Sequence, residues 1–418
     1  MDLAERLRQL GYGGAAAPAG PPRPRHGPGV EQIVPGEFRE TPHGRCFVAK
    51  TVYPLDHAHG GIHLASVFGL PSTALVTLGR SSALEALDFR RVAFLDTETT
   101  GLAGGTGTYV FLVGLGFFQG DEFLVEQYFM RDYGEERAML AALGRTIARF
   151  PAIVSFNGKV FDWPLLQTRF ALARQQLQPA EPLHLDLLFP ARRLWRERLG
   201  SCALSALEEG VLDVRRQVDV PSWLIPSIYF EYVREGDARP LRPVFAHNEH
   251  DILSLLALTV RLGRHIADPL HEAAHPVDLF ATGRIFEGAL AWEECILCYE
   301  KALAGDLPLR LREEALCRLG LVYKRLQRGS HAERTWRALV ERPDCLGTLP
   351  FVELAKHLEH RERDFAAAAV IVERALGLLA RRRADPWDAG RGERERRELE
   401  HRLARLRQKV AKKASAGG

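Results

Sequence analysis

The sequence predicts an α/β domain with a mixed β-sheet, followed by an all-α region of helical repeats. The α/β prediction comes from residues 88 to 265, where segments with strand-like patterns alternate with segments of helical periodicity. The all-α prediction comes from residue 277 onward, where only helical periodicity remains and similar segments recur. A length of 418 residues corresponds to about two or three domains, which agrees with this division.

The composition is that of a globular protein, with 46% hydrophobic and 26% charged residues. The longest nearly apolar run, from Tyr109 to Phe118, has ten residues, whereas a membrane helix needs about twenty. The first ten residues are amphipathic and include acids, unlike a secretory signal. Six irregularly spaced cysteines do not form a disulfide framework, so we expect reduced thiols. These features predict a cytoplasmic protein without membrane association.

Residues 1–39 are expected to precede the folded domain. A short helix at about residues 2–10 is followed by a stretch dense in glycine and proline, which predicts a flexible linker. The segment from Arg45 to Tyr53 alternates and is rich in β-branched and aromatic residues, which predicts a strand. We therefore assign residues 40–270 to one α/β domain with an N-terminal extension.

Five strand-like segments define the α/β domain. Three come in succession before the first helical pattern, and the other two alternate with helices. In chain order the strand-like segments are RVAFLDTE, TYVFLVGLGFF, EFLVEQYFM, AIVSFN and LHLDLL, and the helical ones are EERAMLAALGRTIARF, VFDWPLLQTRFALARQQL, LSALEEGVL and NEHDILSLLALTVRLGRHI. Three successive strands followed by alternating helices and strands predict the mixed sheet.

The region after this domain contains three similar helical segments. Alignment pairs Gly283 with Gly320 and Tyr299 with Trp336, and the third segment has Ala355 at the glycine position. The spacings of 37 and 35 residues are close to the 34 of tetratricopeptide helix hairpins, which stack into solenoids. We therefore predict a small tetratricopeptide-like solenoid, with an irregular helical bundle as the alternative.

We place the solenoid at residues 277–380 and a basic tail, helical or disordered, at residues 381–418. The tail holds 13 Lys or Arg against 6 Asp or Glu, whereas the rest of the chain is slightly acidic. A solvated helix is the more common explanation of such a charge run, and binding to a polyanion is the other.

Two acids interrupt an apolar strand in the stretch RVAFLDTETTGL. Asp96 and Glu98 are two residues apart, so a strand would place both side chains on one face. Neighbouring carboxylates repel each other unless a cation lies between them, and their hard oxygens suit magnesium or manganese. A solvated strand end is the alternative explanation of this pair.

Two further motifs add polar groups to this candidate site. Asn157 and Asp162 follow a buried strand in SFNGKVFDWP, where Asp162 would lie in the first turn of a helix. His247 and Asp251 are four residues apart in HNEHDILSL, so they share one helix face and could serve as a base and a metal ligand. His250 points elsewhere on that helix and is expected at the surface.

Together these motifs resemble the DEDD exonuclease superfamily, which contains proofreading-type 3′→5′ nucleases on the RNase H-like fold. More narrowly, they resemble the YprB family of RNase H-like proteins with a C-terminal tetratricopeptide region. The resemblance extends from about residue 40 to residue 380. The stretches that carry it are FLDTETTGL, GGTGTYVFLVG, SFNGKVFDWPLL, HLDLLFPARRLW, SCALSALE, VPSWLIPSIYFEYVREGD and HNEHDILSL.

The resemblance implies metal-dependent phosphodiester hydrolysis with two divalent ions, Mg²⁺ or Mn²⁺. It assigns the metal ligands to Asp96, Glu98, Asp162 and Asp251, and the general base to His247. Asp96 would bridge the two ions, Glu98 and Asp251 would complete the site of the attacking water, and Asp162 would hold the leaving-group metal. The histidine subclass usually has the spacing H-x4-D, whereas His247 and Asp251 have H-x3-D, which leaves open how His247 reaches the water.

Substrate contacts follow from the same resemblance. Backbone groups near Thr99 would meet the 3′ end of the nucleic acid, and Leu102 would wedge against its last base. We count Asn157 as a further substrate-binding candidate, because it precedes Asp162 in the same motif.

We therefore expect a 3′→5′ exonuclease that acts in DNA repair or nucleic-acid processing, with DNA favoured over RNA as the substrate. The helical repeats would bind the nucleic acid or a protein partner, and a helicase or repair enzyme that supplies single strands would be a logical one. Two alternatives remain open at this point. One is an inactive scaffold in which the repeats carry the function, and the other is an endonuclease on the same fold.

Overall fold

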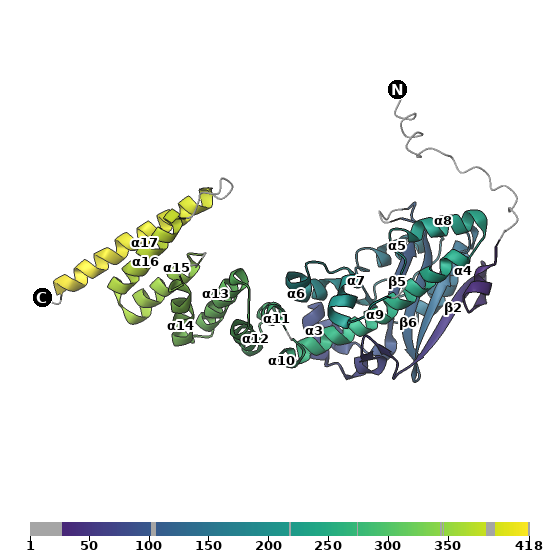
Figure 1. Ribbon diagram of the computed structural model, residues 1–418, viewed down its shortest axis with the longest axis horizontal. Helices are drawn as coiled ribbons and strands as arrows, with labels where there is room; N and C mark the ends of the chain where they lie inside the picture. The colour runs from purple at the N-terminus through teal and green to yellow at the C-terminus, as the bar shows by residue number, and fades with distance from the viewer. Residues whose placement is uncertain are drawn as a thin grey trace, which may run out of the picture. The chain divides into compact units, whose positions relative to one another are not determined.

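The computed structural model describes residues 27–101, 106–216, 219–273, 275–342, 345, 347–381 and 389–416. The chain divides into two compact units (Figure 1). The first comprises the described residues up to Ala191 together with Ser201–Gly263, and the second comprises Arg192–Gly200 and the described residues from Arg264 onward. The helix expected at residues 2–10, most of the linker after it, and Leu102 lie outside the described residues.

A seven-stranded mixed sheet in the order β1-β2-β7-β6-β5-β8-β9 forms the centre of the first unit. Its strands are β1 (Gly36–Thr41), β2 (Gly44–Pro54), β5 (Val92–Thr99), β6 (Val110–Gln119), β7 (Glu122–Phe129), β8 (Ala152–Ser155) and β9 (Leu183–Asp186). The successive strands β5, β6 and β7 pair antiparallel, whereas β8 and β9 continue the other side of β5 in parallel. The prediction of an α/β domain with a mixed, RNase H-like sheet is therefore confirmed.

The strand predicted in the N-terminal extension belongs to this same sheet. In β2, the residues from Cys46 to Ala49 are buried, and Phe47 pairs with Phe129 of β7. The extension therefore adds two strands, β1 and β2, to the side of the sheet that ends in β7. A separate small sheet is formed by β3 (Ala58–His59) and β4 (Ile62–His63).

Helices cover both faces of the sheet. Those that include residues of the first unit are α2 (Val30–Ile33), α3 (Ser72–Gly79), α4 (Glu136–Ile147), α5 (Asp162–Leu172), α6 (Leu188–Leu199), α7 (Leu204–Leu207), α8 (Ile225–Glu235) and α9 (Arg242–Ala267). The adjacent β7 residues Gln127 and Tyr128 point to opposite faces. Tyr128 donates a hydrogen bond of 2.6 Å to Thr146 of α4, whereas Gln127 donates one of 3.0 Å to Asn248 of α9. Thus α4 and α9 pack on opposite faces of the sheet.

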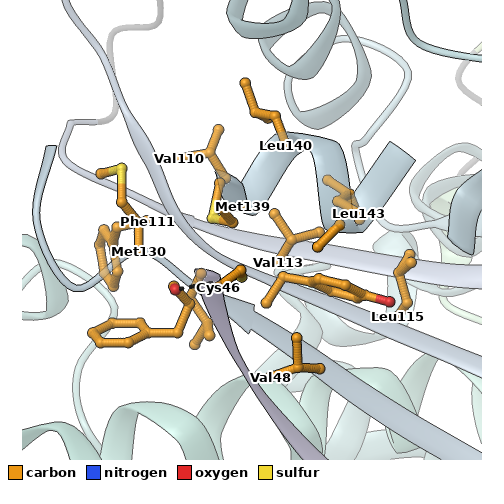
Figure 2. Close-up of a cluster of buried hydrophobic side chains, with 14 of the residues drawn as sticks. Cys46, Val48, Val110, Phe111, Val113, Leu115, Met130, Met139, Leu140 and Leu143 are labelled. Atoms are coloured by element: carbon orange, nitrogen blue, oxygen red, sulfur yellow. Dashed lines mark hydrogen bonds between the residues drawn. The ribbon is translucent and has the colours of Figure 1, made fainter. Parts of the chain in front are cut away.

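The core on the α4 face is apolar. Figure 2 shows Met139 and Leu143 of α4 in one cluster with Val113 and Leu115 of β6. These four side chains are fully or almost fully buried, and burying each contributes about 1.5–3 kcal/mol relative to leaving it in water. This packing holds the central strands of the sheet in place.

On the opposite face, two glycines let α9 approach the sheet closely. A Cβ atom at Gly114 would lie 2.4 Å from Asn248 Oδ1, and one at Gly116 would lie 2.4 Å from Ile252 Cγ2. The glycines are two residues apart on a strand, and Asn248 and Ile252 are four apart on a helix, so each pair shares a face. The glycines of the apolar segment YVFLVGLGFF therefore mark the line along which α9 lies.

The second unit is helical throughout its described elements. Its helices after α9 are α10 (Pro269–Glu272), α11 (Pro276–Gly288), α12 (Trp292–Ala304), α13 (Leu309–Arg325), α14 (Gly329–Val340), α15 (Leu349–His357), α16 (Phe365–Arg381) and α17 (Ala389–Ala416). Gly283 packs against Tyr299, and Gly320 packs against Trp336, so the pairs aligned in the sequence make the same contact in two successive hairpins. The tetratricopeptide-like classification of these hairpins remains a prediction.

The basic tail is helical over residues 389–416 and packs against α16. Leu399, Leu403 and Leu406 are buried along one side of α17. Among the basic residues of α17, Arg402 and Lys409 form ion pairs of 2.9 and 2.7 Å with the buried Glu359. Part of the tail's positive charge is therefore neutralised within the second unit.

Two features bear on the predictions from composition. Among the described helices, none is both long enough and apolar enough to cross a membrane. All six cysteines are free thiols, and Cys295 and Cys298 are buried in α12.

Substitution of Gly114 by alanine should destabilise the first unit by about 1–3 kcal/mol, because the added methyl group would push against Asn248 and separate α9 from the sheet. Chemical denaturation would measure the loss. Gly69→Ala is the matched control, since Gly69 is exposed with nothing within 4 Å of an added Cβ atom. Equal stability of the two variants would contradict the close approach of α9.

Candidate functional site

Polar side chains begin at the carboxyl end of β5, where the buried run Val92–Leu95 ends. Asp96 lies in one row across the sheet with Gly114 and Gln127. Asn248 reaches into this row from α9 and donates a hydrogen bond of 2.8 Å from Nδ2 to Asp96 Oδ2, while its own Oδ1 accepts one from Gln127. The space left by Gly114 therefore allows a buried amide to hold the Asp96 carboxylate.

Asp162 approaches the same strand end from α5. It is the first residue of that helix and is only 6% exposed, and its Oδ1 accepts a hydrogen bond from the hydroxyl of Thr97. The turn before the helix is held by Asp186 of β9, which accepts hydrogen bonds from the backbone N–H groups of Asn157 and Lys159 at 2.8 and 3.1 Å. Asp186 therefore has a structural role in positioning the start of α5.

His247 and Asp251 lie one turn apart on α9, as their spacing predicts. His247 Nε2 is 3.5 Å from Asp251 Oδ2 and 3.9 Å from Glu98 Oε1. One potential ligand atom from each of Glu98, His247 and Asp251 lies within 4.8 Å of the others. Three separate parts of the chain, β5, α5 and α9, thus bring the four predicted acids and the histidine to one end of β5.

Burial and mutual repulsion shift the protonation of these acids. Burial, reinforced by the charges of Asp251, Glu98 and Asp162, raises the pKa of Asp96 well above its usual range. Burial and the charge of Asp251 do the same to the pKa of Glu98, and burial raises the pKa of Asp162 to about 6. The pKa of Asp251 is also raised by burial, although His247 and Arg216 oppose the shift.

This donor set fits divalent cations. Carboxylate oxygens are the preferred ligands of Mg²⁺ and Mn²⁺, and bound cations would let these crowded acids remain ionised together. Asp96, Glu98, Asp162 and Asp251 are the residues that could hold them. The geometry therefore describes an acidic candidate metal site.

Asp219 contacts the Nδ1 side of the His247 ring, whereas Glu98 and Asp251 lie near Nε2. Its Oδ1 lies 2.6 Å from His247 Nδ1. Burial by itself would raise the pKa of Asp219, but the hydrogen bond with His247 and the charges of His247 and Arg216 hold it below its usual value. Arg216 Nη1 also lies 3.0 Å from Nδ1, so both groups contact this side of the ring, and the other ring nitrogen, Nε2, faces Glu98 and Asp251.

Two predicted substrate-binding residues differ in accessibility. The Thr99 side chain is buried and donates to the carbonyl oxygen of Gly101, so it is the backbone here that could meet a substrate. Asn157 is exposed and adopts a left-handed conformation with φ of 66° in the turn before α5.

Sequence patterns did not identify four polar neighbours of this site. They are Glu208, Arg216, Asp219 and Asn248. Asn248 directly follows His247, so its position on α9 was the one available signal. Arg216 and Asp219 lie outside the described helices and strands, so no periodicity in the sequence indicates which way their side chains point.

The fold and the acidic site agree with the family comparison, in which residues 93–263 match the RNase_H superfamily. The first unit is therefore an RNase H-like domain. The chain is 30% identical over 371 residues to the uncharacterized protein YprB of Bacillus subtilis (strain 168), and this alignment covers 88% of the present chain and 86% of YprB. The chain belongs to the YprB family.

A comparison of structures also finds the family B DNA polymerase from the hyperthermophilic archaeon Pyrobaculum calidifontis. The alignment covers 50% of the present chain and 28% of the polymerase, with 17% sequence identity and a TM-score of 0.35.

Asp96→Asn should stabilise the protein in EDTA by roughly 1–3 kcal/mol at neutral pH. The pKa of Asp96 is higher in the folded protein than in the unfolded chain, so the folded state binds the proton more tightly. The stability of the folded protein therefore falls as the pH rises from about 4, the ordinary carboxyl pKa, towards the raised pKa. A neutral amide avoids this loss and can still accept the hydrogen bond from Asn248. Thermal unfolding in EDTA would measure the gain.

The control for this substitution is Asp121→Asn in the exposed turn between β6 and β7. In Mn²⁺ the wild type and the control should both gain thermal stability, whereas Asp96→Asn should gain little. A lower unfolding temperature for Asp96→Asn than for the wild type in EDTA would contradict the repulsion among the acids.

Proposed function

We propose that this protein is a metal-dependent 3′→5′ exonuclease that hydrolyses phosphodiester bonds of nucleic acid, with DNA favoured, by a two-metal mechanism. The observation that carries the proposal is the convergence of Asp96, Glu98, Asp162 and Asp251 at the end of β5, with His247 Nε2 facing two of them. Membership in the RNase H superfamily supports nuclease chemistry at this site. The exonuclease polarity rests on the resemblance of the motifs to DEDD enzymes.

The four acids would share the binding of two divalent ions. The charges of all three other acids raise the pKa of Asp96, so this carboxylate lies among them, and the resemblance to DEDD enzymes assigns it to both ions. Glu98 and Asp251 would bind on the side of His247, and Asp162 would bind on the side of α5. When bound, such ions activate water at neutral pH and stabilise the negative charge that develops on the phosphate.

His247 would act as the general base. Its Nε2 faces Glu98 and Asp251, and in the neutral ring with its proton on Nδ1 this atom would accept a proton from a water bound beside them. Asp219 holds Nδ1 and thereby fixes the orientation of the ring. His247 Nε2 lies 3.9 Å from Glu98 Oε1 and 3.5 Å from Asp251 Oδ2, which supports the proposal that His247 can reach the attacking water even with the H-x3-D spacing.

The helical unit would provide the surface to which a protein partner of the enzyme binds. Stacked helical hairpins commonly present an extended surface to a protein segment. A protein that delivers single strands, such as a helicase or repair enzyme, would suit an exonuclease, and with such a partner the enzyme would act in DNA repair or nucleic-acid processing.

Degradation of end-labelled nucleic acid tests the activity directly. We expect single-nucleotide shortening from the 3′ end in Mg²⁺ or Mn²⁺ and none in EDTA. Asp96→Ala and Asp251→Ala should each abolish it, because each removes a proposed metal ligand. Single- and double-stranded DNA and matched RNA would be compared by gel electrophoresis, with Asp121→Ala as a control for loss of an exposed acid.

Two results would redirect the proposal. Cleavage that tolerates a blocked 3′ end would identify an endonuclease on this fold. Folded protein that cleaves none of these substrates with either metal would instead favour a scaffold whose helical unit carries the function.

His247→Gln should lower kcat about 100-fold or more while leaving Mn²⁺ binding largely intact, because the residue is proposed to move a proton and not to bind the metal. Single-turnover kinetics would measure the rate, and calorimetry would measure the binding of Mn²⁺. His250→Gln, the same change on the same helix, should retain nearly full activity. A wild-type rate for His247→Gln would exclude this histidine as the base.

A further inference from the structure

Arg216 introduces a permanent positive charge among the acids of the site. Its Nη2 donates hydrogen bonds to Asp251 Oδ1 and, at 2.6 Å, to Glu208 Oε1. Its Nη1 lies 3.0 Å from His247 Nδ1 and 3.4 Å from both carboxylate oxygens of Asp219. Only 9% of the side chain is exposed, so solvent screens these interactions weakly.

Glu208 anchors this arginine independently of Asp251. It accepts a second hydrogen bond of 2.8 Å from Arg216 Nε, which completes a bidentate pair. The hydroxyl of Ser254 donates to Glu208 Oε1 at 2.5 Å, and His59 Nε2 lies 2.9 Å from that hydroxyl. Glu208 is held in place by these buried groups and binds Arg216 by its own hydrogen bonds. The bond to Asp251 can therefore break without releasing the arginine from Glu208.

Space next to the guanidinium group allows such a movement. A cavity of about 420 Å³ is lined in part by Glu208, Arg216 and Asp219. The guanidinium group therefore has room to shift away from Asp251. Because Nη2 serves both Asp251 and Glu208, it is the bond from Nε to Glu208 Oε2 that would keep the arginine on its anchor during such a shift.

Arg216 and a metal ion have overlapping requirements at Asp251. The bond from Nη2 uses a lone pair of Oδ1, and metal coordination draws on the lone pairs of the same carboxylate. A guanidinium group this close would also repel a divalent ion bound to Asp251, and burial strengthens that repulsion. The two cations are therefore in direct competition.

We propose that Arg216 is a built-in counter-ion of this centre, which neutralises Asp251 until a divalent metal ion displaces it from Oδ1. The inference rests on the proposed function, in which Asp251 is a metal ligand. Arg216 remains bound to Glu208 during the exchange. It thus weakens metal binding and stabilises the protein when the metal concentration is low.

Arg216→Gln in the full-length chain tests the competition. We expect calorimetry to show Mn²⁺ binding tighter by roughly tenfold or more, because the competing charge is gone. Thermal unfolding in EDTA should occur roughly 5–10 °C lower than in the wild type, since Glu208 and Asp251 lose their buried partner. Mn²⁺ should recover much of that difference.

The matched control is Arg215→Gln, which removes the same charge from the neighbouring exposed residue. It should leave both the Mn²⁺ affinity and the unfolding temperature near wild-type values. If Arg216→Gln does not fold with or without Mn²⁺, Arg216→Lys replaces it. Lysine keeps the positive charge, but its donors lie on one flexible nitrogen and not on the planar fork that joins Glu208 to Asp251, so Mn²⁺ binding should again be tighter than in the wild type, by less than is expected for Arg216→Gln.

The outcomes separate this inference from the proposed function. Mn²⁺ binding by the wild type with equal or weaker binding by the Arg216 variant would overturn the competition and leave the nuclease proposal intact. A lack of Mn²⁺ binding in the wild type and in every variant would count against the metal centre itself, and the competition would fall with it. Tighter binding in the Arg215 control would also overturn the specific role of Arg216.

Discussion

Electrostatic repulsion among four buried carboxylates is the constraint around which the first unit is organised. Asp96, Glu98, Asp162 and Asp251 lie near the end of one strand, and burial raises the pKa of each of them. The charges of neighbouring acids of the cluster raise the pKa values of Asp96 and Glu98 further. Such a group is unfavourable for folding. It persists because the surrounding apolar sheet and its two helical layers stabilise the fold independently of the site, and its cost is reduced where a positive charge or a metal ion is available.

The packing that positions the acids is correspondingly close. Helix α9 meets the sheet at Gly114 and Gly116, and this contact brings Asn248 into hydrogen-bond distance of Asp96. The next residue back, His247, points towards Glu98 and Asp251 as a consequence of the same placement. The two glycines of β6 therefore position both the buried amide of Asn248 and the proposed base His247. A change at this contact between α9 and the sheet would consequently disturb the site as well.

Residues between α7 and α8 have a different role, because they supply charges that complement the cluster. Arg216 balances Asp251 and Glu208, and Asp219 orients His247. In the second unit, buried charges are balanced in a similar way, as Glu359 is paired with Arg402 and Lys409 of the terminal helix. The positive charge of that helix therefore contributes to packing within its own unit, which makes it less available to a polyanion than composition suggested.

The sequence by itself predicted the central strands of the α/β domain, the helices α4, α5 and α9 and the mixed sheet, because these depend on local periodicity and chain order. Short motifs and their resemblance to a known family gave the proposed set of acids. The sequence also indicated that His247 and Asp251 share a face of a helix, since four residues make one turn. Only the tertiary structure decided that β2 joins the main sheet, that Gly114 admits Asn248, and that Arg216 and Asp219 enter the cluster. These outcomes depend on contacts between segments far apart in the chain, and no local sequence pattern predicts which distant residues will lie beside a given segment. Tertiary packing selects that partner, because each buried charge or hydrogen-bonding group must find a complement within the folded unit.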